Sequence, residues 1–168
     1  QTAYDALMDV YEPGCTTQSL TPIFADLKKS IVEWLPEAIE ATRQISVNFL
    51  KDDYPIVGQE KFNQKVAQAL GFDFESGRID ATTHPFCTEL GPHDVRLTTR
   101  YEEDDFTVSL YSVLHEAGHG LYEQGFNPNH AGTPMAEAVS LGIHESQSRL
   151  WENKVGRAPE FWNDWHSV

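Results

Sequence analysis

The sequence predicts a mainly α-helical protein with a small β element around residues 74–101. On both sides of this segment, apolar residues recur at intervals of three and four, which is the period of a helix with one apolar face. Inside it the helical period disappears, glycine, proline and threonine become frequent, and apolar and polar residues alternate. The 168 residues are 40% hydrophobic, enough for one ordinary core, so we expect a single domain over residues 1–168.

Turn and cap residues divide the first part of the chain into helices. Pro22 suits the first turn of a helix, where its missing N–H has no partner to lose, and Pro36 is expected to kink the same helix. Gly71 suits a helix end, because glycine readily adopts the left-handed conformation found there. The expected helices before the β element cover residues 1–11, 21–44 and 59–70.

A strand is expected over residues 94–101. Its period of two divides the side chains between two faces, with Val95, Leu97, Thr99 and Tyr101 on one and Asp94, Arg96, Thr98 and Arg100 on the other. Helical periodicity then returns over residues 104–124 and 135–153. A last helix opens near Pro159, and its aromatic residues are expected to form a core stripe of Phe161, Trp162 and Trp165.

Composition excludes several classes of function. Lys and Arg total 12 against 26 Asp and Glu, so the formal charge is 12 − 26 = −14, and so acidic a chain would repel nucleic acids and anionic membranes. Cys15 and Cys87 form no Cys-x-x-Cys pattern, which argues against a disulfide framework or a thiolate zinc site. We find no basic, apolar leader and no run of about 20 apolar residues. We therefore expect a soluble cytoplasmic protein with no nucleic-acid or membrane partner.

The segment from His115 to His119 matches the pattern His-Glu-x-x-His inside a predicted helix. Because a helix turns about 100° per residue, side chains four positions apart leave the same face, so the two imidazoles can bind one metal ion. Glu116 points to the same side and can reach a water on the ion without binding the metal itself. This pattern predicts a metal centre.

A catalytic zinc usually has three protein ligands and keeps one position for water. A third histidine at position 125 is excluded, because the chain has Tyr122 and Gly125 where that pattern needs glycine and histidine. Glu145 shares a face of the next predicted helix with Ala138, Leu141 and Gly142. A carboxylate buried among such groups would be stabilised by a divalent cation. We predict Glu145 as the third ligand, and the alternative is an ordinary ion pair with Arg149.

Four motifs, in the same order, resemble the carboxypeptidase Taq family of zinc metallocarboxypeptidases. They are His84-Pro85-Phe86, DVRLTTR at 94–100, HEAGHG at 115–120 and GIHESQSRLWEN at 142–153. The resemblance spans nearly the whole chain and implies a helical, zincin-like fold around a deep groove. It implies zinc, for which cobalt could substitute, held by His115, His119 and Glu145, with Glu116 as catalytic carboxylate. It further implies homodimers that remove single residues from peptide C-termini with broad side-chain tolerance.

The mechanism expected from this site is hydrolysis by a water that zinc activates while Glu116 accepts its proton and passes it to the leaving amine. A terminal carboxylate on the substrate needs cationic or hydrogen-bonding groups. The candidates for substrate binding are Arg96, Thr98, Arg100 and His144. For the arginines the alternative is ion pairing with Asp94 or nearby acids, and for His144 it is support of a metal ligand.

Later motifs of the types Ile-Arg-x-x-Ala-Asp and Gly-x-x-Gln-Asp-x-His-Trp do not occur. The resemblance therefore implies that residues 1–168 are one partial domain, the N-terminal and central portion of a longer metallocarboxypeptidase, with zinc-site helices at 104–124 and 135–153. Whether this portion is active alone stays open. Two other functions remain as alternatives, a zinc-dependent endopeptidase and a non-catalytic helical module that a metal stabilises.

Overall fold

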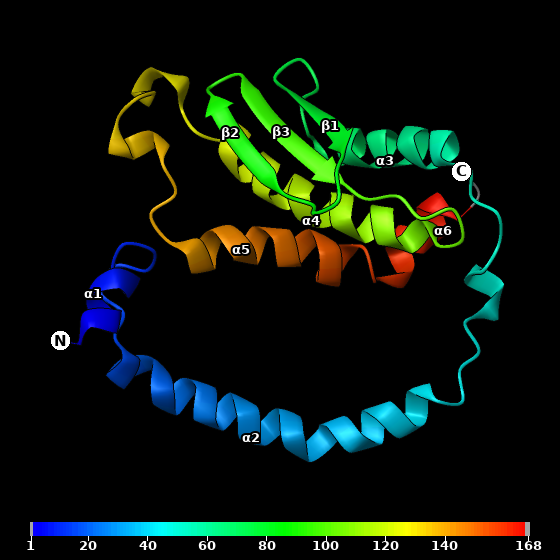
Figure 1. Cartoon of the computed structure of the whole chain (residues 1–168), viewed down its shortest axis with the longest axis horizontal. Helices are drawn as coiled ribbons and strands as arrows, with labels where there is room; N and C mark the ends of the chain where they lie inside the picture. Colours follow the sequence, from blue (N-terminus) through cyan, green and yellow to red (C-terminus); the bar gives the residue numbers. More distant parts are fainter. Residues whose placement is uncertain (1, 167–168) are drawn as a thin grey trace. The chain divides into compact units, whose positions relative to one another are not determined.

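The computed structural model describes residues 2–166, and its elements follow the predicted order of helices, strands and helices (Figure 1). They fall into two compact units, residues 1–51 with 139–141, and residues 52–138 with 142–168. The first unit contains α1 (Ala3–Met8) and α2 (Thr17–Thr42). The second contains α3 (Ile56–Leu70), β1 (Gly77–Ala81), β2 (Cys87–Gly91), β3 (Asp94–Thr99), α4 (Phe106–Gln124), nearly all of α5 (Leu141–Arg149), a π-helical segment (Leu150–Val155) and α6 (Pro159–Trp165). The fold is mainly α with one small sheet, as the sequence predicts.

Asp5 connects the two helices of the first unit. Its side chain forms a capping box with Thr2, in which each side chain accepts the backbone N–H of the other residue. The second carboxylate oxygen of Asp5 accepts the N–H of Thr17 at 2.7 Å, at the start of α2. These bonds from backbone N–H groups lower the pKa of Asp5. The predicted helix 1–11 is therefore shorter, and residue 1 lies outside the described residues.

The long helix α2 begins one turn earlier than the predicted residue 21. Thr16 and Ser19 form a capping box that satisfies the first backbone N–H groups, so Pro22 falls inside the helix. Pro36 also lies inside it, and the helix continues to Thr42. None of the described side chains of α2 is buried, and its apolar face, including Phe24, is largely exposed.

The sheet of the second unit has the order β1-β3-β2, with β1 parallel and β2 antiparallel to the central β3. Val95, Leu97 and Thr99 of β3 are buried, which confirms the predicted face. Thr98 on the opposite face is also buried, because its hydroxyl bonds to the backbone N–H of Phe86 at 2.9 Å. The strand ends at Thr99, two residues before the predicted end.

Helix α4 lies between the sheet and the segment of α5 (Figure 1). A Cβ added at Gly120 would lie 2.9 Å from Leu97 of the sheet, whereas one added at Gly118 would lie 2.6 Å from the backbone of Gln147 in α5. The two glycines therefore let α4 approach both neighbours closely. On another side of α4, Leu114 packs with the core that contains Phe161 of α6, so the predicted aromatic stripe is part of the core.

The predicted helix 135–153 is wrong at both ends. A short 3₁₀ turn covers Pro134–Ala136, the backbone is then extended at Glu137, and α5 starts only at Leu141, whose N–H bonds to the carbonyl of Tyr11 at 2.8 Å. After Arg149 the helix continues as the π-helical segment to Val155.

No helix in the described part of the chain is long and apolar enough to cross a bilayer.

Candidate metal centre

Helix α4 carries the two histidines because its ends and its apolar face are well defined. Asp105 caps its first turn by accepting the N–H of Thr107 at 2.9 Å. Leu110, Val113 and Ala117 are completely buried on the faces turned to the sheet and to α3. The remaining face, toward α5, is the one that presents polar side chains.

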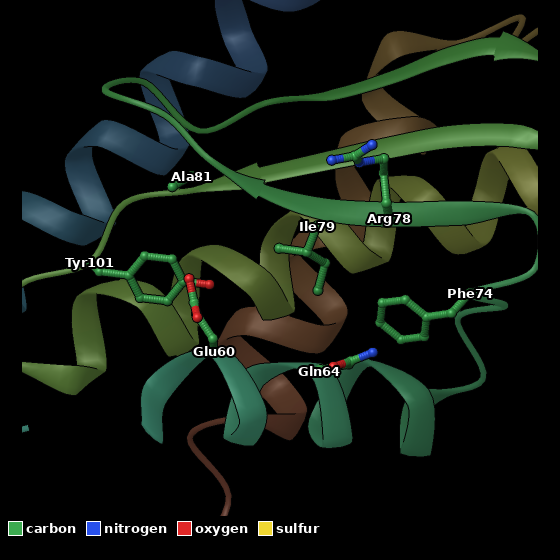
Figure 2. A pocket seen from close by; sticks show the side chains of 7 residues that line it. All are labelled: Glu60, Gln64, Phe74, Arg78, Ile79, Ala81 and Tyr101. Carbon is green, nitrogen blue, oxygen red and sulfur yellow. The ribbon is translucent and has the colours of Figure 1, made fainter. Parts of the chain in front are cut away.

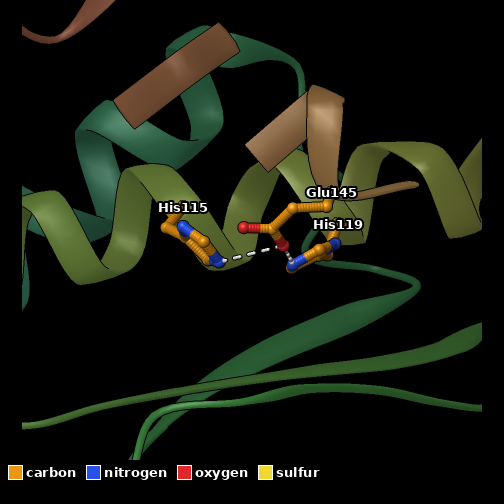
Figure 3. Close-up of side chains that lie close together, drawn as sticks. All are labelled: His115, His119 and Glu145. Carbon is orange, nitrogen blue, oxygen red and sulfur yellow. Dashed lines mark ion pairs between the residues drawn. The ribbon is translucent and has the colours of Figure 1, made fainter. Parts of the chain in front are cut away.

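Three side chains meet between α4 and α5 (Figure 3). One ligand atom each from His115, His119 and Glu145 lies within 4.8 Å of the other two. Oε2 of Glu145 is 3.2 Å from Nε2 of His119 and 3.7 Å from Nε2 of His115. Two imidazole nitrogens and a carboxylate oxygen directed at one point form a donor set that suits a divalent metal ion.

Glu145 is less buried than predicted. Its side chain is 41% exposed, because Ala138 does not belong to α5 and Leu141 faces solvent. Its second oxygen, Oε1, accepts a bond from Nε of Arg149 at 2.9 Å. One oxygen of Glu145 thus faces the two histidines, as expected of a metal ligand, and the other contacts Arg149, the alternative partner. Burial alone would raise the pKa of Glu145, but the charge of His115, hydrogen bonds from Arg149 and Ser148, and the charge of His119 bring it below its usual value.

The outer nitrogens of both rings are hydrogen-bonded. Nδ1 of His115 lies 2.8 Å from Oε2 of Glu152, and Nδ1 of His119 lies 2.7 Å from Nδ1 of His144. Both Nε2 atoms are therefore left for the common point. Burial, followed by the charges of His144 and His115, lowers the pKa of His119 to about 4. A neutral imidazole is the form that binds metal.

Glu116 follows His115 on α4 and is 93% buried, with 7% of its surface exposed. Its pKa is raised to about 7, chiefly by burial; the charge of His115 lowers the pKa, and the charges of Glu145 and Glu152 contribute to the rise. A carboxyl group with a pKa near neutral can both accept and release a proton under ordinary conditions. This is the property expected of a general base.

The whole chain matches one family of known proteins. The model of the carboxypeptidase Taq (M32) metallopeptidases matches residues 1–167. The chain belongs to this family. It is 48% identical to thermostable carboxypeptidase 1 of Thermus thermophilus over 159 residues, which are 95% of the chain and 31% of that protein. It is 40% identical to carboxypeptidase 1 of Bacillus subtilis over 163 residues, 97% of the chain and 32% of that protein.

Solved structures agree with this assignment. The M32 carboxypeptidase of Deinococcus radiodurans R1 superposes with a TM-score of 0.90 at 45% identity, covering 97% of this chain and 33% of that one. The crystal structure named BsuCP gives a TM-score of 0.93 at 39% identity over 99% of this chain and 34% of that one. The chain thus spans about a third of the length of these M32 proteins.

The residues predicted to bind substrate have other partners in the structure. Arg96 forms two bonds of 2.8 Å to Asp94, and Arg100 pairs with Glu102 at 3.1 Å. Thr98 bonds to the backbone of Phe86. The ion pairing offered as an alternative is therefore what the structure shows, and none of these side chains belongs to the three-residue cluster.

Two further carboxylates contact the histidines around this cluster, and the sequence did not lead us to predict either of them. Glu152 contacts His115, and Glu123 contacts His144. A signal was available, since Glu123 follows His119 by one helical turn and Glu152 follows Glu145 by two. Carboxylates at those intervals on the helices of a metal site are candidates for outer partners.

A pocket of about 410 Å³ lies elsewhere in the second unit, between α3 and β1 (Figure 2). Its lining contains none of the three candidate ligands and consists of Glu60, Gln64, Phe74, Arg78, Ile79, Ala81 and Tyr101. We place the functional site at the His-His-Glu cluster because that cluster carries the groups needed for metal-assisted hydrolysis.

Proposed function

We propose that His115, His119 and Glu145 hold the zinc ion of a carboxypeptidase, and that Glu116 is its general base. The observation that carries this proposal is the meeting of the three ligand atoms within 4.8 Å on two helices. Nitrogen and oxygen donors without thiolate suit a water-activating zinc, for which cobalt could substitute. The partly exposed Glu145 leaves a side of the cluster open for water and substrate.

When bound, the ion would supply a Lewis acid for the scissile carbonyl and for water. The residues of the chain supply the proton transfers. The Glu116 carboxylate takes the proton of the attacking water and then delivers it to the nitrogen of the leaving amine. Its burial favours this role, because a pKa of about 7 lets it be charged in one step and neutral in the next.

Removal of C-terminal residues from peptides, with broad side-chain tolerance, is proposed on the likeness to the relatives, which are named carboxypeptidases. The test is a chimera in which these residues replace the matched third of the Bacillus subtilis protein. We expect one zinc per chain and cleavage of a peptide with a free C-terminus. Cleavage of the same peptide with an amidated C-terminus would instead support an endopeptidase.

The role of Glu116 is tested in the same chimera by Glu116→Gln. We expect zinc to be retained and kcat/KM to fall by about 10²–10⁴-fold, the usual contribution of a general base. Unchanged turnover would reject Glu116 as the base. Zinc binding without any peptidase activity in the folded chimera would favour the metal-stabilised module.

We also propose that the protein is cytoplasmic and forms a homodimer. The free thiols of Cys15 and Cys87 are consistent with a reducing compartment. The homodimer is proposed on the family resemblance. Light scattering measures the molar mass of the purified protein in solution, which for a dimer is twice the mass of one chain.

A further inference from the structure

A chain of three side chains leads outward from the metal centre. His144 of α5 lies between His119 and Glu123 of α4, with its Nδ1 2.7 Å from Nδ1 of His119 and its Nε2 2.6 Å from Oε1 of Glu123. The three side chains are only 14% to 17% exposed. Buried polar contacts of this length constrain both the position and the proton of each ring.

We propose that Glu123 is a positioning residue of the metal centre, which acts through His144 to keep the proton of His119 on Nδ1 and its Nε2 lone pair toward the bound ion. This inference rests on the proposed metal site. It assigns no contact between Glu123 and substrate or metal.

The direction of the hydrogen bonds follows from the chemistry of the groups. An ionised carboxylate only accepts, so His144 donates its Nε2–H to Glu123. When His144 is neutral, its other nitrogen is an acceptor, so Nδ1 of His144 accepts and His119 donates from its own Nδ1. The Nε2 lone pair of His119 then faces Glu145 Oε2, 3.2 Å away, an arrangement that is favourable when a cation binds both atoms.

The surroundings hold His144 in this bridging position. Its ring lies at 18° to the ring of His119 with centroids 4.5 Å apart, and Tyr122 lies against it at 4.8 Å. Both of its nitrogens already have partners. His144 therefore acts in support of a ligand, the alternative offered for it by the sequence, rather than in binding substrate. His115 reaches the same state more simply, because Glu152 bonds to its Nδ1 directly.

The experiment measures the tautomer of His144 and the affinity for zinc in the 168-residue chain. Imidazole ¹⁵N shifts of the zinc-loaded wild type should place the His119 proton on Nδ1 and the His144 proton on Nε2. Glu123→Leu removes the acceptor, so His144 should no longer hold its proton on Nε2 alone, and zinc affinity should fall about 10- to 100-fold in a chelator competition. Glu123→Gln keeps an oxygen that can accept and should restore most of both properties.

Glu137→Leu is the matched control, because Glu137 lines the same surface pocket as Glu123 but is exposed. It should change neither the tautomer nor the affinity. A His144 proton found on Nδ1 in the zinc-loaded wild type would overturn the proposal without any variant. A wild type that binds zinc while Glu123→Leu binds it equally well would overturn the role of Glu123 alone. A wild type that binds no zinc would overturn the proposed metal site and this role together.

Discussion

Glu152 accepts a hydrogen bond of 2.8 Å from Nδ1 of His115, although the two residues are 37 positions apart and belong to different helical segments. The same carboxylate contacts Arg149 at 3.0 Å and Arg157 at 3.6 Å. Glu152 thus ties the histidine of α4 to the segment that follows α5. An outer carboxylate of this kind orients a histidine ligand and makes it more basic.

Replacement of Glu152 by alanine should weaken zinc binding by about 10- to 100-fold, because His115 loses the acceptor that orients its ring. Chelator competition with a zinc indicator measures the affinity. Arg157→Ala is the control, since it removes a charge partner of the same carboxylate and leaves the contact with His115 in place, and it should leave the affinity unchanged. Equal affinities for the wild type and the Glu152 variant would contradict the prediction.

Each carboxylate oxygen of Glu145 has its own partners, the two histidines for Oε2 and Arg149 for Oε1, and two variants separate their effects. Zinc at 100 times its Kd should stabilise the wild type by about 2.7 kcal/mol through binding to the folded state alone. Glu145→Ala should abolish this gain, whereas Arg149→Ala should keep most of it, because the arginine contacts Glu145 at the oxygen turned away from the histidines and otherwise contacts Glu152. Thermal unfolding with and without zinc measures both. If the gain survives in Glu145→Ala, the residue is an ion-pair partner only.

Gly118 sets the distance between α4 and α5. A Cβ there would lie 2.6 Å from the backbone of Gln147 and of Ser148, so Gly118→Ala should destabilise the second unit by about 1–3 kcal/mol. Zinc affinity should fall with it, because Glu145 lies on the displaced helix. Denaturant unfolding measures the first effect.

Gly58→Ala is the control for the same substitution in a helix. Nothing lies within 4 Å of a Cβ at Gly58, so alanine should be neutral or stabilise by about 0.5–1 kcal/mol. A loss of stability at Gly118 no larger than at Gly58 would show that the close approach has no energetic consequence.

Asp5 should make the first unit sensitive to acid. Its pKa is lowered from 3.8 by bonds from the backbone N–H groups of Thr17 and Thr2. A lowered pKa contributes stability above 3.8 that is lost as the pH falls through the lower value of the folded state. Asp5→Asn should therefore be less stable than the wild type at pH 7, and the difference should shrink in strong acid. Circular dichroism at a series of pH values measures this, with Asp26→Asn on exposed α2 as the control substitution.

Much of the fold was predictable because it depends on local patterns. The alternation of Val95, Leu97 and Thr99 places one face of β3 in the core, and Gly71 ends α3 with a φ of 104°. The start of α2 could have been predicted from the capping pair Thr16 and Ser19, which the placement of the helix start by Pro22 overlooked. The boundary of α5 was not, because it coincides with a bond from Leu141 to a carbonyl 130 residues earlier in the chain, at Tyr11.

The cluster of His115, His119 and Glu145 was predictable from the sequence, but the groups around it were not. The spacing of His115 and His119 fixes them on one helix face, and Glu145 does meet them. The argument used for Glu145 was nevertheless wrong, because it assumed burial among small residues of a helix that starts later than predicted.

The sequence by itself determined which side chains could share an ion, since helical geometry alone places residues four apart on one face. Only the tertiary structure decided how close Glu145 comes to them and which groups hold the outer ring nitrogens. The distance from Glu145 to the histidines depends on how α4 and α5 pack at Gly118. Glu152 contacts His115 from 37 positions away, and His144 contacts His119 from 25 positions away. Such contacts depend on how separate helices pack, which no local period of the sequence specifies.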